Sequence, residues 1–62
     1  MNKYYNQINE VLISYEEHKS YHTKNISWAC NRIDWCWKWR KITEDQMNEL
    51  ADRATAILRG EI

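Results

Sequence analysis

The segment from Trp28 to Lys41 constrains the fold most, because an α-helix made from it is apolar on two sides. It holds four tryptophans, two cysteines and four basic residues within fourteen positions. At about 100° per residue, one side of such a helix carries Trp28, Trp35, Trp39 and Ile42, and the other carries Ile26, Ala29, Cys30, Ile33, Cys36 and Trp37. A helix that is apolar on two faces is buried on two faces, inside the fold, in an oligomer or against a partner.

The length of the chain favours one small domain. A domain of 62 residues buries only about 60% of the surface that its unfolded chain exposes. Domains of this size commonly need a disulfide, a metal ion or oligomerisation for stability. We therefore expect residues 1–62 to form a single all-helical domain that is completed by oligomerisation.

The spacing of apolar residues predicts helices throughout the chain. There is no proline, and Gly60 is the only glycine, so the usual signals of β-turns are missing. Apolar residues at helical spacing predict a long first helix over about residues 3–20. The spacing runs through Tyr4, Ile8, Val11, Tyr15, His18 and His22, with Tyr5 and Leu12 widening the stripe, and its apolar part fades after Tyr15. Thr23 or Asn25 is expected to cap the tryptophan-rich second helix, which is predicted over about residues 25–41.

A third helix is predicted over about residues 44–59. Thr43 and Gln46 have the spacing of a capping box, in which each side chain accepts from the backbone N–H of the other residue. Gly60 is a typical residue just after a helix end. The link from the second helix is only Ile42 and Thr43, which makes the second and third helices neighbours.

These elements predict a small three-helix bundle with the tryptophan-rich helix in the centre. The third helix is expected to cover one apolar face of the second helix, and the first helix is expected to cover the other. The apolar stripes of the two outer helices are too narrow to cover all four tryptophans. A second chain or a partner is therefore expected to complete the burial.

Charge and targeting signals narrow the classes of function. The formal net charge is zero, which removes any global electrostatic reason to bind nucleic acid or an anionic membrane. Residues 19–41, however, carry six basic residues and one acidic residue, so the tryptophans lie in a basic segment. No hydrophobic signal core and no apolar run of transmembrane length is visible. We therefore expect a cytoplasmic protein with reduced cysteines and no membrane contact.

Residues that could carry chemistry are few. His18 and His22 could join Cys30 and Cys36 as zinc ligands, but structural zinc sites typically have only about two to four residues between paired cysteines, and here there are more. Ordinary histidines and small apolar cysteines are the favoured interpretation. A catalytic cysteine would need a histidine in reach and a substrate pocket, for which so short a helical chain leaves little room. We expect no enzyme activity, no metal and no cofactor.

The uncovered tryptophans favour a function in binding. Short chains without catalytic residues are typical of interaction proteins encoded by phages and mobile elements, which often act by occupying a surface of a host enzyme. We therefore expect a homo-oligomeric protein–protein interaction module, an inhibitor or adaptor of a host defence or regulatory protein in the host cytosol. The expected contact residues, for self-contact or target contact, are Tyr4, Tyr5, Trp28, Trp35 and Trp39.

A small nucleic-acid-associated regulator is the alternative function. Aromatic side chains beside cations hold single strands by stacking on bases and contacting phosphates. The cations that would make such contacts are Lys38, Arg40 and Lys41. Two features of the helix weaken this alternative: Trp37 points away from Trp35 and Trp39, and the cations are scattered between the rings.

Overall fold

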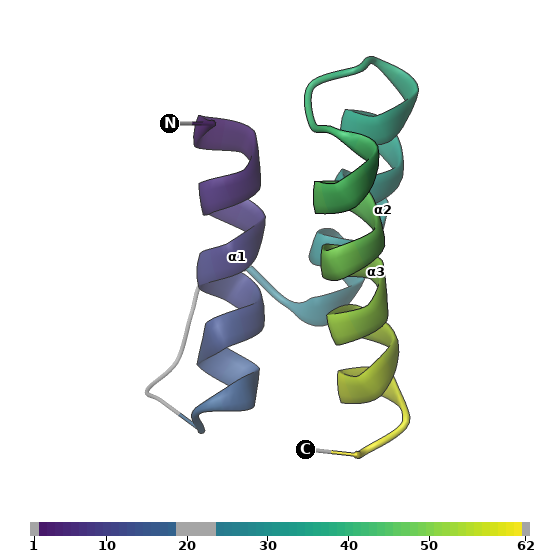
Figure 1. Ribbon diagram of the computed structural model, residues 1–62. Helices are drawn as coiled ribbons and strands as arrows, with labels where there is room; N and C mark the ends of the chain where they lie inside the picture. The colour runs from purple at the N-terminus through teal and green to yellow at the C-terminus, as the bar shows by residue number, and fades with distance from the viewer. Residues whose placement is uncertain (1, 19–23, 62) are drawn as a thin grey trace.

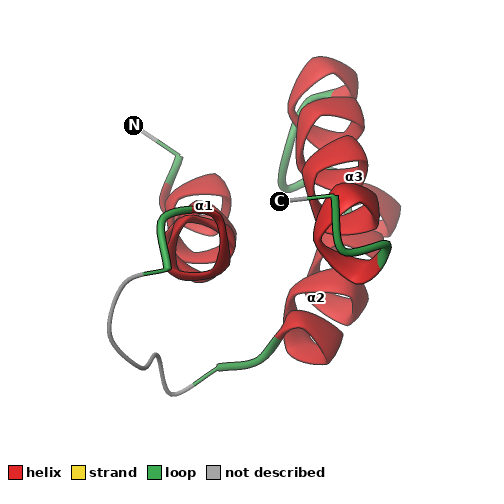
Figure 2. Cartoon of the chain, turned by 90° about the horizontal axis from the view of Figure 1, so that it is seen from below, coloured by secondary structure: helices red, strands yellow, loops and turns green. Residues whose placement is uncertain are grey.

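The computed structural model describes residues 2–18 and 24–61, which form three α-helices (Figure 1). Helix α1 spans Lys3–Glu16, α2 spans Ile26–Lys38 and α3 spans Glu44–Leu58. Each helix contacts the other two, so the three helices pack as a triangle around one shared core (Figure 2). The predicted all-α three-helix bundle is confirmed. None of these three helices has the length and apolar character that crossing a bilayer requires.

Side chains at predicted positions cap the starts of α2 and α3. The Gln46 N–H donates to Thr43 Oγ1 at 3.1 Å, and the Thr43 N–H donates to Gln46 Oε1 at 3.0 Å, so the predicted capping box is confirmed. Asn25 Oδ1 accepts from the Trp28 N–H at 2.8 Å and caps α2. Thr23, the other residue predicted for that role, lies outside the described residues. These bonds satisfy N–H groups that the first turn of a helix otherwise leaves unpaired.

Asn2 caps α1 and also ties it to the connection between α2 and α3. Its Oδ1 accepts from the backbone N–H groups of Tyr4 and Tyr5 at 2.9 and 3.3 Å. Its Nδ2 donates to the Lys41 carbonyl oxygen at 2.7 Å. The first turn of α1 is therefore held beside the segment that follows α2.

Helix α2 ends at Lys38, earlier than the predicted end near Lys41. Arg40 adopts a left-handed φ of 56°, and its N–H donates to the Trp37 carbonyl at 3.1 Å. The Lys41 N–H donates to the Cys36 carbonyl at 2.7 Å, which completes a Schellman motif. This end has no clear sequence signal, because glycine or asparagine usually occupies the left-handed position and here it is arginine.

Helix α1 also ends earlier than predicted, at Glu16 rather than near residue 20. The cause is the same, because His18 has a left-handed φ of 52° and cannot continue the helix. Helix α3 ends at Leu58, within one residue of the prediction. At this end the left-handed residue is Gly60, with a φ of 71°. The end of α3 is therefore the one of the three helix ends that a glycine in the sequence indicates.

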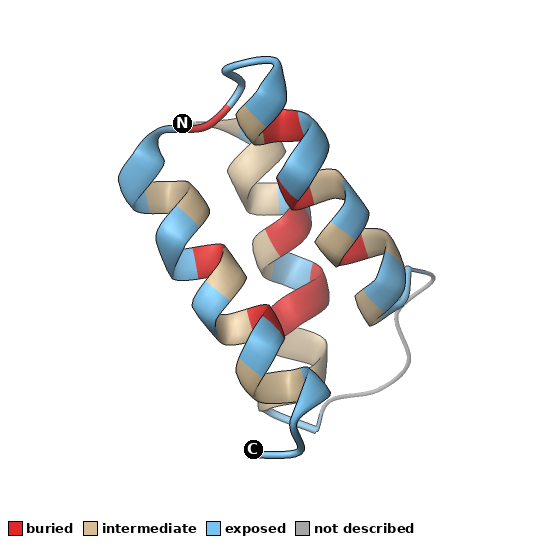
Figure 3. Ribbon diagram, turned by 90° about the vertical axis from the view of Figure 1, so that its right-hand side faces the viewer, coloured by how far each residue is buried: buried red, intermediate tan, exposed pale blue. Residues whose placement is uncertain are grey.

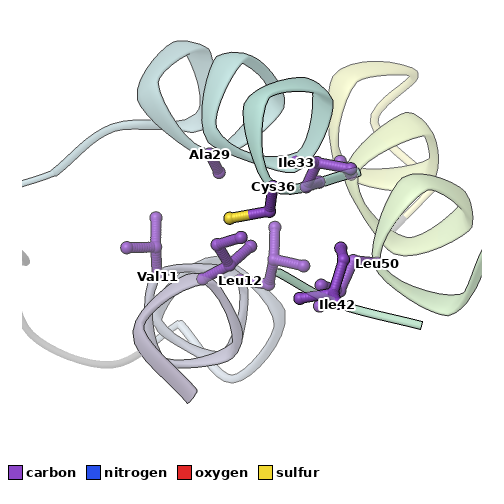
Figure 4. Packing of buried hydrophobic residues seen from close by; sticks show 9 residues of the cluster. Val11, Leu12, Ala29, Ile33, Cys36, Ile42 and Leu50 are labelled. Carbon is purple, nitrogen blue, oxygen red and sulfur yellow. The ribbon is translucent and has the colours of Figure 1, made fainter. Parts of the chain in front are cut away.

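The core lies where one stripe of each helix meets the other two. Its buried side chains are Ile8, Val11 and Leu12 of α1, Ala29, Ile33 and Cys36 of α2, Ile42 of the connection, and Leu50 and Ala54 of α3 (Figure 4). Ile42, predicted on the tryptophan side of the second helix, joins the core because α2 ends before it. Figure 3 shows these buried positions on the inward sides of the helices, with exposed positions facing out.

This packing corrects the prediction that the outer helices cover opposite faces of the second. Helices α1 and α3 both pack against the single stripe of Ala29, Ile33 and Cys36, and they also contact each other. In a triangle each helix buries one stripe in a common core, whereas covering opposite faces would separate α1 from α3 and divide the core in two. The side of α2 that carries Trp35 therefore lies at the edge of the bundle.

Candidate interaction surface

Two tryptophans at the C-terminal end of α2 remain exposed. Trp35 is 38% exposed and Trp39 is 58% exposed, and Leu58, at 62%, is the other large apolar side chain exposed to this degree in the described chain. Trp28 and Trp37 are half-buried. The tryptophan surface that α1 and α3 leave uncovered is thus centred on Trp35 and Trp39.

Tyr4 of α1 extends this surface across the helix boundary. Its ring centroid lies 6.2 Å from that of Trp35, with the two planes tilted by 37°. This separation is in the favourable range for aromatic pairs. The hydrogen bond from Asn2 to the Lys41 carbonyl holds the start of α1 at the end of α2, which keeps the two rings together.

Cations surround these three rings. Arg32 Cζ lies 4.3 Å from the Trp35 ring centroid and 5.8 Å from that of Tyr4. The Nζ atoms of Lys3 and Lys41 lie 5.4 and 5.7 Å from the Tyr4 centroid, and Lys38 Nζ lies 6.0 Å from that of Trp39. We call this set the aromatic–cationic surface: Tyr4, Trp35 and Trp39, with Lys3, Arg32, Lys38 and Lys41. Each cation–π contact contributes about 0.5–1 kcal/mol at exposed positions, so the rings help to hold the cations in place.

An open groove between α1 and α2 adjoins the surface. Its volume is about 370 Å³, and it is lined by Gln7, Glu10, Lys24, Trp28 and Arg32. Lys24 Nζ lies 5.5 Å from the Trp28 ring centroid. Arg32 belongs to both the groove and the aromatic–cationic surface, and Glu10 brings a negative charge to the groove side.

Three of the five predicted contact residues come together in the aromatic–cationic surface. Tyr4 and Trp35 are in ring contact, and Trp39 lies one helical turn from Trp35, to whose carbonyl its N–H donates at 3.0 Å. Trp28 lines the groove and packs against the core. Tyr5 faces α3 instead, where its hydroxyl donates to the Glu49 carboxylate at 2.8 Å. One position along a helix rotates the side chain by about 100°, which is enough to place Tyr4 and Tyr5 on different sides of α1.

Arg32 and Lys3 belong to this surface although the sequence interpretation did not single them out. Arg32 precedes Trp35 by three positions on α2, a spacing that puts both side chains on one helix face, so a local signal existed. The approach of Tyr4 to Trp35 joins two helices and has no local signal.

The three cations predicted for nucleic-acid contact do not form one ridge. Lys38 and Lys41 lie in the aromatic–cationic surface. Arg40 instead stacks on Trp37, with Cζ 4.5 Å from the ring centroid. Trp37 is two positions from Trp35 and so lies on the opposite flank of α2.

A second polar cluster joins α1 to α3. Arg53 Nε and Nη2 donate to the two Glu16 carboxylate oxygens at 2.8 and 2.7 Å, and Nη1 donates to Asn9 and to Glu49 at 2.7 Å each. Hydrogen bonds from Arg53 hold the pKa of Glu16 below its ordinary value. Burial, followed by the hydrogen bond to Glu49, raises the pKa of Tyr5. All three Arg53 nitrogens are used within the fold, so this cluster holds α1 against α3.

The two cysteines are poor nucleophiles at neutral pH. Both thiols are free, Cys36 is fully buried, and burial raises the pKa of both Cys30 and Cys36. Because the thiolate is the reactive form, a raised pKa makes both side chains less reactive. His22 of the zinc alternative lies outside the described residues. Within residues 2–18 and 24–61, no group of three or more His, Cys, Asp or Glu side chains is placed to hold a metal ion.

Comparison with known proteins adds no further assignment. The chain matches no protein-family model, no curated protein and no solved structure. Its own residues therefore provide the functional argument. Exposed aromatic rings flanked by cations form a surface that suits an anionic group next to an apolar one.

Proposed function

We propose that this chain is a protein–protein interaction module, and that its aromatic–cationic surface binds an acidic region of another protein. The single observation behind this proposal is the exposure of Trp35 and Trp39 among cations that lie 4.3–6.0 Å from aromatic ring centroids. Trp, Tyr and Arg are the residue types most enriched among those that dominate binding energy at protein interfaces. All three types occur together on this surface.

The exposed indoles can supply only part of the binding free energy. With about 200 Å² for a tryptophan side chain and about 25 cal/mol per Å², covering the exposed 58% of Trp39 contributes about 3 kcal/mol. The same arithmetic gives about 2 kcal/mol for Trp35. Association itself costs at least about 4 kcal/mol in lost freedom of motion. Even at that lower limit the two indoles leave a net gain of only about 1 kcal/mol, which is too small for a stable complex. We therefore propose that ion pairs with the surrounding cations add to the binding, and that the partner is acidic.

The same charges restrict how copies of this chain could associate. In a two-fold dimer built on this surface, the patch that carries Arg32, Lys38 and Lys41 would face the same cationic patch of the other copy. Two like charges about 4 Å apart repel by about 4 kcal/mol at an effective dielectric constant near 20. We therefore propose homo-oligomers only in a head-to-tail form, with the surface against exposed acids of α3 such as Glu44 and Asp45. Light scattering over a wide range of protein concentration tests this form, and a monomer throughout would contradict it.

Affinity capture with matched variants tests the interaction module, including its form as an inhibitor or adaptor of a host protein. Wild type, Trp39→Ala and Leu58→Ala are immobilised side by side in lysate, and the retained proteins are compared by mass spectrometry. We expect a protein that wild type and Leu58→Ala retain and Trp39→Ala loses. Leu58 is a suitable control because it is as exposed as Trp39 but lies at the end of α3. Equal retention by all three forms, or retention by none, contradicts the proposal.

Single-stranded nucleic acid is a second candidate ligand, favoured by the position of Lys38 and Lys41 beside the Trp39 and Tyr4 rings. Fluorescence anisotropy of a labelled oligothymidylate at several salt concentrations tests it. Contact with three or four phosphates predicts a slope of log K against log salt of about −2 to −3. Absence of binding at low salt would remove this candidate.

A further inference from the structure

We infer that the Arg32 guanidinium is a preformed receptor for a carboxylate of the partner, held in place by the Tyr4 and Trp35 rings. This inference rests on the proposed function and specifies the chemistry of the ligand. The ligand is a protein segment in which an acidic side chain neighbours an apolar one.

Arg32 is held by aromatic rings rather than by hydrogen bonds. Its Cζ lies 4.3 Å from the Trp35 ring centroid and 5.8 Å from that of Tyr4. Its Nε is buried and has no hydrogen-bond partner. Among residues 2–18 and 24–61, the hydrogen bonds and ion pairs of arginine side chains are those of Arg53, and none involves the terminal nitrogens of Arg32. Because Nε is out of a ligand's reach, the donors that Arg32 offers are those of its two terminal nitrogens, which the aromatic rings help to hold in position.

Arg53 is a useful comparison, because its hydrogen bonds hold α1 against α3. Arg53 makes four hydrogen bonds to side chains of α1 and α3. Arg32 makes none to the described residues, even though Glu10 lines the same groove. The terminal N–H groups of Arg32 therefore have no protein acceptor to give up when a ligand binds, and charge-assisted hydrogen bonds to a carboxylate are about twice as strong as neutral ones.

A carboxylate matches the donors that Arg32 has left. Guanidinium and carboxylate are both planar forks, and two parallel hydrogen bonds join them. Because stacking on Trp35 already restricts the Arg32 side chain, less conformational entropy is lost when the ligand binds. Lys3 and Lys41 add positive charge beside Tyr4, whereas Glu10 would repel an acid in the groove. An acidic ligand is therefore directed onto the aromatic–cationic surface.

A protein segment fits this surface better than a nucleic acid does. Arg32 covers one face of Trp35, and Tyr4 lies tilted against the same ring, so little of that ring is free to stack on a base. Trp39 is 58% exposed and can receive an apolar side chain of the same segment. These two features favour an acidic side chain at Arg32 and an apolar neighbour at Trp39.

A fluorescein-labelled peptide of alternating glutamate and leucine tests the inference by anisotropy with the 62-residue chain. We expect saturable binding to wild type and an increase in Kd of about ten-fold in Arg32→Lys, which keeps the charge but loses the planar fork. Arg40→Lys is the matched control, because Arg40 stacks on Trp37 on the opposite flank of α2. Its Kd should stay within about two-fold of wild type, since the ligand does not reach it.

A second measurement leaves the protein unaltered. The same peptide with glutamine in place of glutamate should bind wild type about ten-fold more weakly, because the amide cannot accept both hydrogen bonds. Equal binding of the two peptides, or no saturable binding of the acidic one, overturns the inference. Tighter binding of an oligothymidylate than of the acidic peptide also overturns it, in favour of phosphate.

The variants also separate this inference from the proposed function. If Trp39→Ala weakens peptide binding and Arg32→Lys does not, the interaction surface stands and the Arg32 receptor is overturned. If neither variant changes binding, both proposals are overturned. Circular dichroism of each variant confirms that a lost interaction does not come from a lost fold.

Discussion

Replacing Arg53 by methionine removes the charged link between α1 and α3 while keeping most of the apolar stem. Arg53 binds both Glu16 oxygens, and the two side chains are only 21% and 22% exposed. Breaking a fully buried ion pair by removing one member costs about 3–5 kcal/mol, and breaking an exposed pair costs about 0–1 kcal/mol. Because this pair is only partly buried, the expected loss lies between these limits, at about 2–3 kcal/mol of unfolding free energy.

That loss is large for a domain of this size. At about 0.05–0.15 kcal/mol per residue, a 62-residue chain is stable by about 3–9 kcal/mol. A loss of about 2–3 kcal/mol should lower Tm by about 10–20 °C. Urea unfolding followed by tryptophan fluorescence measures the change. Arg59→Met is the control, because Arg59 is exposed on the last turn of the bundle and its removal changes the net charge equally.

The pH dependence of this loss has a definite sign. The pKa of Glu16 is below its ordinary value in the folded chain, because Arg53 stabilises the ionised form. The pair therefore contributes its stability above pH 4.5, and that contribution is lost as the pH falls through the lowered pKa. We expect the stability difference between Arg53→Met and Arg59→Met to be full near neutral pH and to shrink as the pH falls below 4.5. Equal stabilities of the two variants at neutral pH, or a difference independent of pH, would refute this account.

Three further perturbations test the core, the cap and the thiols. Leu50→Ala should lower the free energy of unfolding by about 2–5 kcal/mol, because Leu50 is fully buried. The control Leu58→Ala should stay within about 0.5 kcal/mol of wild type, because Leu58 is exposed. Equal urea midpoints of the two variants would contradict the core assignment. Thr43→Ala should cost about 1 kcal/mol by removing the capping box. Thermal unfolding measures this loss, and an unchanged Tm would contradict it. Cys36 should react with a thiol reagent only after unfolding, and more slowly than the partly exposed Cys30; labelling of Cys36 as fast as that of Cys30 in native protein would contradict its burial.

Local features of the fold could be predicted because their interactions join residues close in sequence. The capping box at Thr43 and the cap at Asn25 each involve residues three positions apart, and both form as predicted. The ends of α1 and α2 could not be predicted in the same way. The left-handed residues at these ends are His18 and Arg40. Neither is a usual residue type at the left-handed position of a helix end, so neither indicates a helix end in the sequence as Gly60 does.

The candidate surface could be predicted in part. The spacing places Trp35 and Trp39 one turn apart on α2, where both are exposed, and it could also have included Arg32, although their role in binding stays a prediction. It does not indicate that Tyr4 reaches Trp35 while its neighbour Tyr5 bonds Glu49 of α3. That difference depends on which side of α1 each neighbouring helix occupies, and the rotation of α1 about its axis is fixed only when the bundle packs.

The sequence by itself determined three helices and a central helix with more apolar surface than its neighbours could cover. The tertiary structure decided where that surplus lies, because triangular packing buries only one stripe of α2 and leaves Trp35 and Trp39 at the edge. It also decided that Arg53 makes four hydrogen bonds to side chains of α1 and α3, while Arg32 Nε is buried without a partner. Helix periodicity depends on near neighbours, whereas these outcomes depend on contacts between helices that are distant in sequence. Such contacts follow from how the helices rotate and pack against one another, which near-neighbour spacing does not specify.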